Sequence, residues 1–584
     1  AKKAAEHYRQ SIKLRGQLAK DFPDTPTYRQ ELAGSYSGLA ILLQALGKQK
    51  EADEAYGQAL DLQQKIVKDF PHLPDYRRSL ASSFNNRGIM LLSGNRRKEG
   101  EAALVKAMEL WNALGADYPD IPEYAMELAG TYLNLGAVWQ ASQPKNALDV
   151  GRRALALRRN LAEKNPEVPV HQEELARTEG NLGLMLLSRE PQEAKSLFGH
   201  AVEIFTKLAR ANPMNPDYRH QLAVSHNNLG NALRVLNDPK EAEAAWRRSI
   251  DLYQDLVHEF EEVPSYAEEL GKRYNELGIF LVSARRLPDA EKAWKDGMAV
   301  QKRLLARHPD RPEYRVELGR SEGNLGILYV QAGDNKRAEQ QYRKGIALLE
   351  EHEPRLGATP ALAGYVGELI KIHANLANLM TALNKPAEAE KSWLRQLELR
   401  EKLVNAFPQL PNFRLEAVAA LNELGNRVVQ NKQFSEAKVF YQKAVSHLRE
   451  LTKGPDTAPE MWTNLYLMQL NLATSLSGLK DYAAVAQVIR DMAPQAPPST
   501  RQDHVAAALL ARCAGLAAKD SGLADGKRAE LAKTYGAEAI ALLRQAMRNG
   551  FRDAELLRTS EDFQAIRDRE DFQQLLKDLP VTKN

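Results

Sequence analysis

The sequence predicts an all-α solenoid, in which helix pairs stack side by side. Apolar residues recur at helical spacing and strand-like alternation is absent. A small residue, often after Asn-Leu, also recurs along more than 430 residues, at gaps of 48, 48, 47, 47, 48, 48, 51, 48 and 48. We call it the anchor; its positions are Ala40, Gly88, Gly136, Gly183, Gly230, Gly278, Gly326, Ala377, Gly425 and Ala473. Ten anchors predict about ten helix pairs.

Each repeat is expected to hold two helices. In the first repeat, the first helix places four apolar residues on one face: Tyr28, Leu32, Leu39 and Leu43. Gly47 then interrupts the pattern, as a C-terminal stop does. The second helix carries its own apolar face, made of Ala52, Tyr56, Ala59, Leu62 and Ile66.

A small residue and a large ring follow most anchors at fixed offsets. Ala242 and Trp246 follow Gly230 by 12 and 16 residues. Small residues let two backbones approach closely, and the ring fills the space between neighbouring pairs. A bulky residue at a small site would overpack the core and destabilise the fold by about 1–3 kcal/mol.

The motif P-x-x-P-x-Y joins one repeat to the next, as in "FPDTPTYRQEL" from Phe22. Its tyrosine becomes Phe413 and His171 in two repeats, which argues against a phosphorylation site. The first proline follows a helix that it cannot continue, and the second begins the next helix, where its missing N–H has little effect. We interpret the motif as a structural hinge whose ring is the first core residue of the new helix.

The run Leu325-Gly326-x-x-Tyr329, followed by Ala338-x-x-x-Tyr342, resembles the tetratricopeptide repeat (TPR). That family has a period of about 34 residues, and the additional residues here lengthen both helices. The resemblance covers residues 1–490. It implies a right-handed superhelix whose first helices line a concave groove that binds a protein or an extended peptide, without catalysis.

The segment "ALLRQAMRNGFRDAELLRTSEDFQAIRDREDFQQLL" (541–576) resembles the closing segment of TPR-bearing serine/threonine protein kinases from planctomycete-type bacteria. This resemblance implies a kinase domain upstream of residue 1, for which the array would act as sensor or recruit substrates. A free-standing binding scaffold is the other interpretation.

The expected organisation has three parts. Residues 1–22 form the second helix of a truncated repeat, 23–490 form the array, and 491–584 form a Pro-rich connector and a helical cap. A distinct terminal unit is expected because the last face of a solenoid meets water. The repeats are expected to begin near 23, 71, 119, 166, 213, 261, 309, 357, 408 and 456. The unusual segment 351–364 replaces the Pro-x-x-Pro link of one repeat.

Composition and motifs argue against most chemistry. Lys and Arg (80) nearly balance Asp and Glu (76), unlike a nucleic-acid binder. Nucleotide-binding, zinc-protease, hydrolase and kinase motifs are missing, so we expect no enzyme, cofactor or metal. Cys513 lies among apolar residues, which favours a buried, inert thiol. No apolar run approaches bilayer length, so we expect a cytoplasmic chain, or an extracytoplasmic one if a membrane segment precedes it.

One polar position recurs two residues before the anchor. Because Asn is a poor helix former, its repetition within helices needs a reason. Facing the groove, these amides could give a donor and an acceptor to each peptide group of an extended ligand. They could instead bond neighbouring helices and only keep the register. We call these residues the Asn column: Asn86, Asn134, Asn181, Asn228, Asn324, Asn375 and Asn471.

Overall fold

The computed structural model describes residues 2–351, 357, 359–454, 457–492 and 494–579. In this part of the chain all regular structure is helical, which confirms the predicted fold class. The chain divides into two compact units, Ala1–Leu304 (unit 1) and Leu305–Asn584 (unit 2), and each is described by itself. The predicted limits of the array, 23–490, stay a prediction. Six residues of the unusual link (352–356 and 358) and the start near 456 lie outside the described residues.

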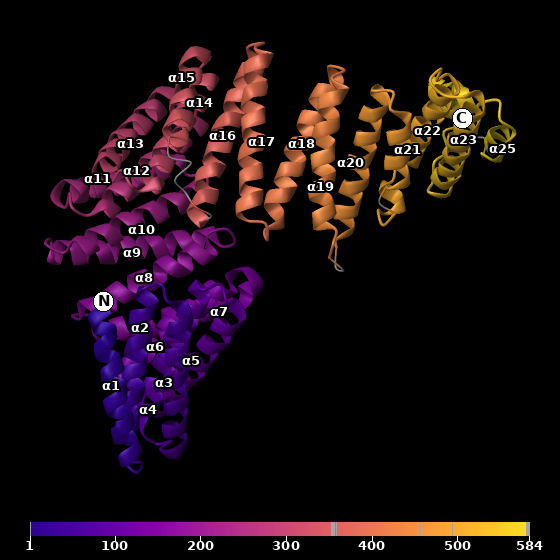
Figure 1. Cartoon of the computed structure of the whole chain (residues 1–584). Helices are drawn as coiled ribbons and strands as arrows, with labels where there is room; N and C mark the ends of the chain where they lie inside the picture. The colour runs from indigo at the N-terminus through magenta and orange to yellow at the C-terminus, as the bar shows by residue number, and fades with distance from the viewer. Residues whose placement is uncertain (1, 352–356, 358, 455–456, 493, 580–584) are drawn as a thin grey trace. The chain divides into compact units, whose positions relative to one another are not determined.

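Unit 1 begins with α1 (Lys2–Asp21) and continues as helix hairpins stacked in chain order (Figure 1). Its first helices are α2 (Pro26–Ala45), α4 (Pro74–Ser93), α6 (Pro122–Ser142), α8 (Pro169–Leu186), α10 (Pro216–Val235) and α12 (Pro264–Ser283). Its second helices are α3 (Gln49–Asp69), α5 (Arg97–Asp117), α7 (Pro144–Lys164), α9 (Pro191–Ala211), α11 (Pro239–Glu259) and α13 (Leu287–Arg307), the last of which crosses the unit boundary.

Unit 2 begins with the same helix hairpins and ends in helical segments of unequal length. Its first helices are α14 (Pro312–Gln331), α16 (Pro360–Ala382), α18 (Pro411–Gln430) and α20 (Pro459–Gly478). Its second helices are α15 (Asn335–Glu350), α17 (Pro386–Ala406), α19 (Phe434–Leu451) and the short α21 (Tyr482–Arg490). Further helical segments follow: η2 (Pro498–Thr500), α22 (Asp503–Ala518), α23 (Asp525–Arg548), α24 (Ala554–Thr559), η3 (Glu561–Ile566) and α25 (Glu570–Asp578).

The Pro-x-x-Pro links are hinges, as predicted. The second proline opens the next helix, as Pro74 does for α4. The aromatic residue before the first proline contacts the ring after the second: the centroids of Phe70 and Tyr76 lie 6.1 Å apart, and those of Tyr118 and Tyr124 lie 6.3 Å apart. The rings therefore hold the chain where it turns from one repeat into the next.

The turn inside most pairs uses a left-handed residue seven positions after the anchor. Gly47 (φ +72°) fills this position after α2, which agrees with its predicted role as a stop. The same position has positive φ in seven other pairs, at Asn95, Asn237, Arg285, Gly333, Asn384, Lys432 and Lys480. The described turns after α6 and α8 have no such residue, and these are the two repeats of 47 residues. The missing residue therefore shortens this turn.

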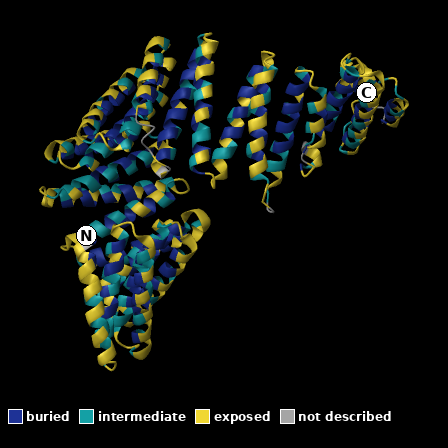
Figure 2. Cartoon of the chain, in the orientation of Figure 1, coloured by how far each residue is buried: buried dark blue, intermediate teal, exposed yellow. Residues whose placement is uncertain are grey.

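The anchors bring the two helices of a pair together, as the sequence predicted. A Cβ atom built on Gly230 would lie 2.6 Å from the Trp246 ring, and one on Gly278 would lie 2.5 Å from Trp294. These distances are shorter than van der Waals contact, so a side chain at either anchor would displace the ring. Buried residues accordingly lie between the helices and exposed residues on the outer faces (Figure 2).

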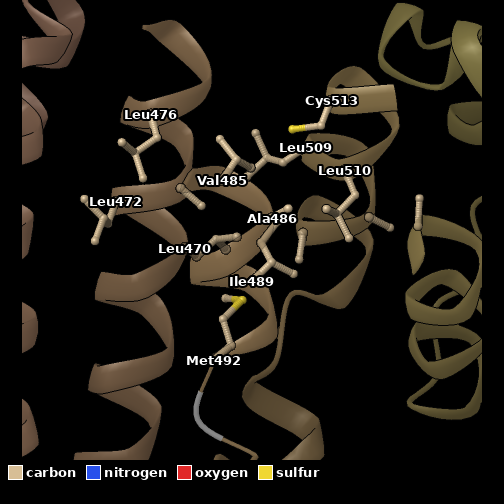
Figure 3. Packing of buried hydrophobic residues seen from close by; sticks show 14 of the residues in the cluster. Leu470, Leu472, Leu476, Val485, Ala486, Ile489, Met492, Leu509, Leu510 and Cys513 are labelled. Atoms are coloured by element: carbon tan, nitrogen blue, oxygen red, sulfur yellow. The ribbon is translucent and has the colours of Figure 1, made fainter. Parts of the chain in front are cut away.

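The core of unit 2 continues past the last hairpin into α22. Leu476 from α20, Ile489 from α21 and Leu509 from α22 belong to one cluster (Figure 3). Cys513 is fully buried in the same cluster, and burial raises the pKa of its thiol to about 12. A thiol with such a pKa is protonated near neutral pH, so the prediction of a buried, inert cysteine is confirmed. None of the described helices combines the length and the apolar character that spanning a bilayer requires.

Candidate binding surface on the first helices

The first helices form the more closely spaced row of the array. In unit 1, α2 approaches α4, and α8 approaches both α6 and α10; in unit 2, α14 approaches α16. Neighbouring second helices do not approach to the same extent anywhere in the described residues. An array with one tighter row curves towards that row, so in unit 1 we expect the first helices on the inner side of the curve.

The structure places every member of the Asn column at one register on a first helix. Unit 1 holds Asn86 on α4, Asn134 on α6, Asn181 on α8 and Asn228 on α10. Unit 2 holds Asn324 on α14, Asn375 on α16 and Asn471 on α20. Asn181 is exposed and the others are half-buried. Glu276 on α12 and Glu423 on α18 take the position in two other pairs.

Two members of the column bond neighbouring first helices. The Nδ2 of Asn134 donates to Oδ1 of Asn85 on α4, at 3.2 Å. The Nδ2 of Asn471 donates in the same way to Oδ1 of Asn422 on α18, at 3.1 Å. In both bonds the donor is a column residue, and the acceptor lies 49 residues earlier, on the preceding first helix. For these two junctions, the amide keeps the register between repeats.

Other members of the column keep their amides available. Asn86, Asn181, Asn228 and Asn375 make no side-chain hydrogen bond to any residue that the structure describes. An exposed or half-buried carboxamide can offer two N–H donors and a carbonyl acceptor to another molecule. Three of these four available amides belong to unit 1.

The junction between α10 and α12 lacks the Asn–Asn hydrogen bond that joins α4 to α6. Asn227 on α10 occupies the position of Asn85, but the residue 49 positions later is Glu276, whose carboxylate has no N–H to donate. The Asn227 side chain is 6% exposed, and its buried Oδ1 has no hydrogen-bond partner in the described part of the chain. Leaving a buried acceptor unpaired destabilises a fold by about 1–3 kcal/mol.

An exposed aliphatic row, which the sequence analysis missed, runs beside the column. The residue after the anchor is Ile41, Ile89, Leu184 and Ile279 on α2, α4, α8 and α12, with exposures of 51%, 39%, 47% and 53%. It lies three residues after the column position, hence on the same helix face. Ala137 and Asn231 fill the place on α6 and α10. The signal was present in the sequence: large apolar residues at helical spacing from the Asn column, away from the core face.

Carboxylates on this face are largely neutralised by neighbours. Burial opposes ionisation of Glu269 on α12, but Lys272 and Arg273, at 2.7 and 2.8 Å, outweigh it, and the pKa of Glu269 is lowered. Glu174 on α8 similarly pairs with Arg158 at 3.0 Å. At these two positions the charge on the inner face of unit 1 is therefore compensated.

Unit 1 also contains a cavity of about 690 Å³ among α7, α8 and α9 that the sequence did not predict. Its carboxylate Glu179 is 1% exposed, and burial raises its pKa. The Nδ1 of His200 lies 2.8 Å from both carboxylate oxygens, and Arg159 lies 3.5 Å away. These partners satisfy Glu179, so the cavity has no orphaned group to mark a ligand. No group of three or more His, Cys, Asp or Glu among the described residues could hold a metal.

Comparison with known proteins gives a family match for three segments. Residues 32–72, 222–257 and 271–310 match the model "Tetratricopeptide repeat". A search of curated protein sequences gives no match. The predicted link with bacterial protein kinases stays a prediction.

Several solved structures are similar in fold. BtubC from P. vanneervenii is 20% identical, with 44% of this chain and 91% of that chain covered and a TM-score of 0.36. The apo form of RapI is 15% identical over 69% and 98% of the chains, with a TM-score of 0.41. The apo quorum sensor NprR from B. thuringiensis is 15% identical over 68% and 98%, with a TM-score of 0.37. The chain thus carries tetratricopeptide repeats at residues 32–72, 222–257 and 271–310, within an all-helical repeat array.

Proposed function

We propose that this chain is a non-catalytic scaffold that binds an extended segment of a partner protein across the first helices of unit 1. One observation carries the proposal: on α4 and on α8 an available amide lies beside an exposed aliphatic side chain, and the aliphatic row continues on α2 and α12. An extended peptide needs both, because its backbone requires hydrogen-bond partners and its apolar side chains gain by leaving water.

The spacing of the helices favours a particular ligand conformation. Packed helices lie about 8–10 Å apart. A polyproline II segment advances about 9 Å in three residues and leaves its backbone groups free to bond a receptor. Every third side chain of such a segment would then meet the next first helix, and those that meet α2, α4, α8 and α12 would contact the aliphatic row. A segment that crosses the six first helices of unit 1 would be about 15 residues long.

The amides supply the backbone contacts in this proposal. Asn86, Asn181 and Asn228 can each donate to a peptide carbonyl and accept from a peptide N–H. Contacts to the backbone carry little sequence preference, so selectivity would come from the aliphatic row.

A peptide selection tests the proposal. Random peptides displayed on phage are selected against the whole chain, and then against a variant with Ile89→Asn, Leu184→Asn and Ile279→Asn. Asparagine naturally occupies this register at Asn231, Asn378 and Asn426, so the variant is expected to fold. A control variant, Val439→Asn, removes an exposed aliphatic residue from the second helix α19.

We expect the selected peptides to carry aliphatic residues about three or six positions apart and to lose binding to the triple variant alone. Equal binding to wild type and the triple variant would contradict the proposal.

A further inference from the structure

A second site lies in unit 2, apart from the proposed peptide surface. A cavity of about 810 Å³ opens where α19, α20 and the turn after it meet α22, α23 and η3. Ligand sites for small molecules typically enclose about 300–1,000 Å³. Its charged lining residues are Lys480, Arg512, Lys519, Lys533, Arg569, Glu561 and Asp562.

Positive charge exceeds negative charge in this lining. Arg512 lies 3.6 Å from Asp562, and Arg569 pairs with Asp571 at 2.9 Å. The other three cations, Lys480, Lys519 and Lys533, form no ion pair with any described residue. Three exposed ammonium groups around one concave surface favour an anionic occupant.

The interior of the cavity has a different character. Its uncharged wall is largely small or apolar, with Phe434, Ala514, Leu516 and Ala565 among its members. Ser477 also lines it, is 3% exposed, and has a buried hydroxyl without a hydrogen-bond partner among the described residues. Such a hydroxyl gains most from a ligand that accepts or donates a hydrogen bond there.

We infer that this cavity binds a small organic anion. The apolar body of the ligand packs against Phe434 and Leu516, and its phosphate or carboxylate group meets the lysines. Lys480 holds a left-handed backbone conformation (φ +60°) that places it at the turn between α20 and α21. The site is independent of the peptide surface, because all of its lining residues belong to unit 2.

Calorimetry on the whole chain tests the inference with defined probes. Phenyl phosphate and benzoate supply the anion on an apolar ring, phenol supplies the ring alone, and inorganic phosphate supplies the charge alone. We expect phenyl phosphate or benzoate to bind at least about tenfold tighter than phenol, because a hydrogen bond to a charged group is stronger than one to a neutral group. The tighter of the two identifies whether the site takes phosphate or carboxylate.

Variants then locate the binding. Lys519→Ala and Lys480→Gly should each weaken the better anion about fivefold, and glycine suits the left-handed turn at position 480. Lys577→Ala, on α25 outside the lining, should leave binding unchanged.

Three results would overturn the inference: binding of neither anion, equal binding of phenol and the anions, or equal loss with Lys577→Ala. Inorganic phosphate that binds as tightly as phenyl phosphate would refute the apolar part of the site.

Discussion

In units 1 and 2 the residue directly after the anchor takes the same position on each first helix, but its side chain differs between the units. After the anchor, unit 1 carries the large aliphatic residues Ile41, Ile89, Leu184 and Ile279, with Ala137 and Asn231 between them. Unit 2 has one such residue, Ile327, followed by Asn378, Asn426 and Thr474. The buried positions around this site hardly differ, since the anchors of both units are Gly or Ala. The fold therefore constrains the anchor and leaves its exposed neighbour free, so the difference between the units reports on what each surface contacts.

The largest expected effect comes from making unit 1 resemble unit 2. Ile89→Asn, Leu184→Asn and Ile279→Asn together should weaken a selected peptide about 100-fold, since each half-exposed aliphatic residue contributes about 1 kcal/mol when it is covered. Isothermal calorimetry measures the change. Asn378→Ala and Asn426→Ala, the control in unit 2, should leave the affinity within about twofold. Comparable losses from both sets would mean that the difference between the units has no bearing on binding.

A smaller effect is expected from the available amides. Asn86→Ala, Asn181→Ala and Asn228→Ala together should weaken the same peptide about tenfold or more, because each lost hydrogen bond contributes about 0.5–1.5 kcal/mol. Asn375→Ala in unit 2 is the matched control. Unaltered affinity of the triple variant, with the aliphatic variant still impaired, would assign binding to side-chain burial alone.

The bonded amides should affect stability instead of binding. Asn134→Ala removes the donor to Asn85 and should destabilise the α4–α6 junction by about 1 kcal/mol. Hydrogen exchange of the backbone amides in α4 and α6 measures this locally, which suits an array whose repeats need not unfold together. Asn228→Ala should leave exchange in its neighbourhood unchanged, and a similar loss there would show that the two classes of Asn do not differ.

The smallest effect is a gain. Glu276→Asn or Glu276→Gln would place an N–H opposite the unpaired Oδ1 of Asn227, by analogy with the bond from Asn134 to Asn85. We expect slower exchange in α10 and α12, equivalent to about 0.5–1 kcal/mol. Glu423→Asn on α18 is the control, because the residue 49 positions before it is Ala374, which has no side-chain acceptor. Faster exchange in the Glu276 variants would contradict this view of the junction.

Much of the fold could be predicted because it repeats. A constraint such as ring packing against Gly230 recurs at Gly278, so a pattern invisible in one repeat becomes clear in ten. The hinges were predicted for the same reason, because proline restricts the backbone wherever it stands. The division into two units was not predicted, and nothing in the period near residue 304 marks it.

The candidate sites were harder to predict because they depend on contacts between different repeats. The sequence placed Asn134 and Asn181 in one column but could not tell that the first is bonded and the second is available. That distinction depends on the residue just before the column position on the preceding first helix, which is the acceptor Asn85 for Asn134 and the apolar Leu133 for Asn181. The cavity in unit 2 joins residues from Phe434 to Arg569, and no local pattern indicates that they meet.

The most direct measurement locates a bound peptide on the whole chain. A selected peptide carrying a photo-reactive diazirine at one aliphatic position is cross-linked to the protein, and the attachment sites are mapped by mass spectrometry. We expect cross-links to the segments of α4, α8 and α12 that hold Ile89, Leu184 and Ile279. Cross-links that fall mainly on the second helices, or on α16–α20, would contradict the proposed peptide surface.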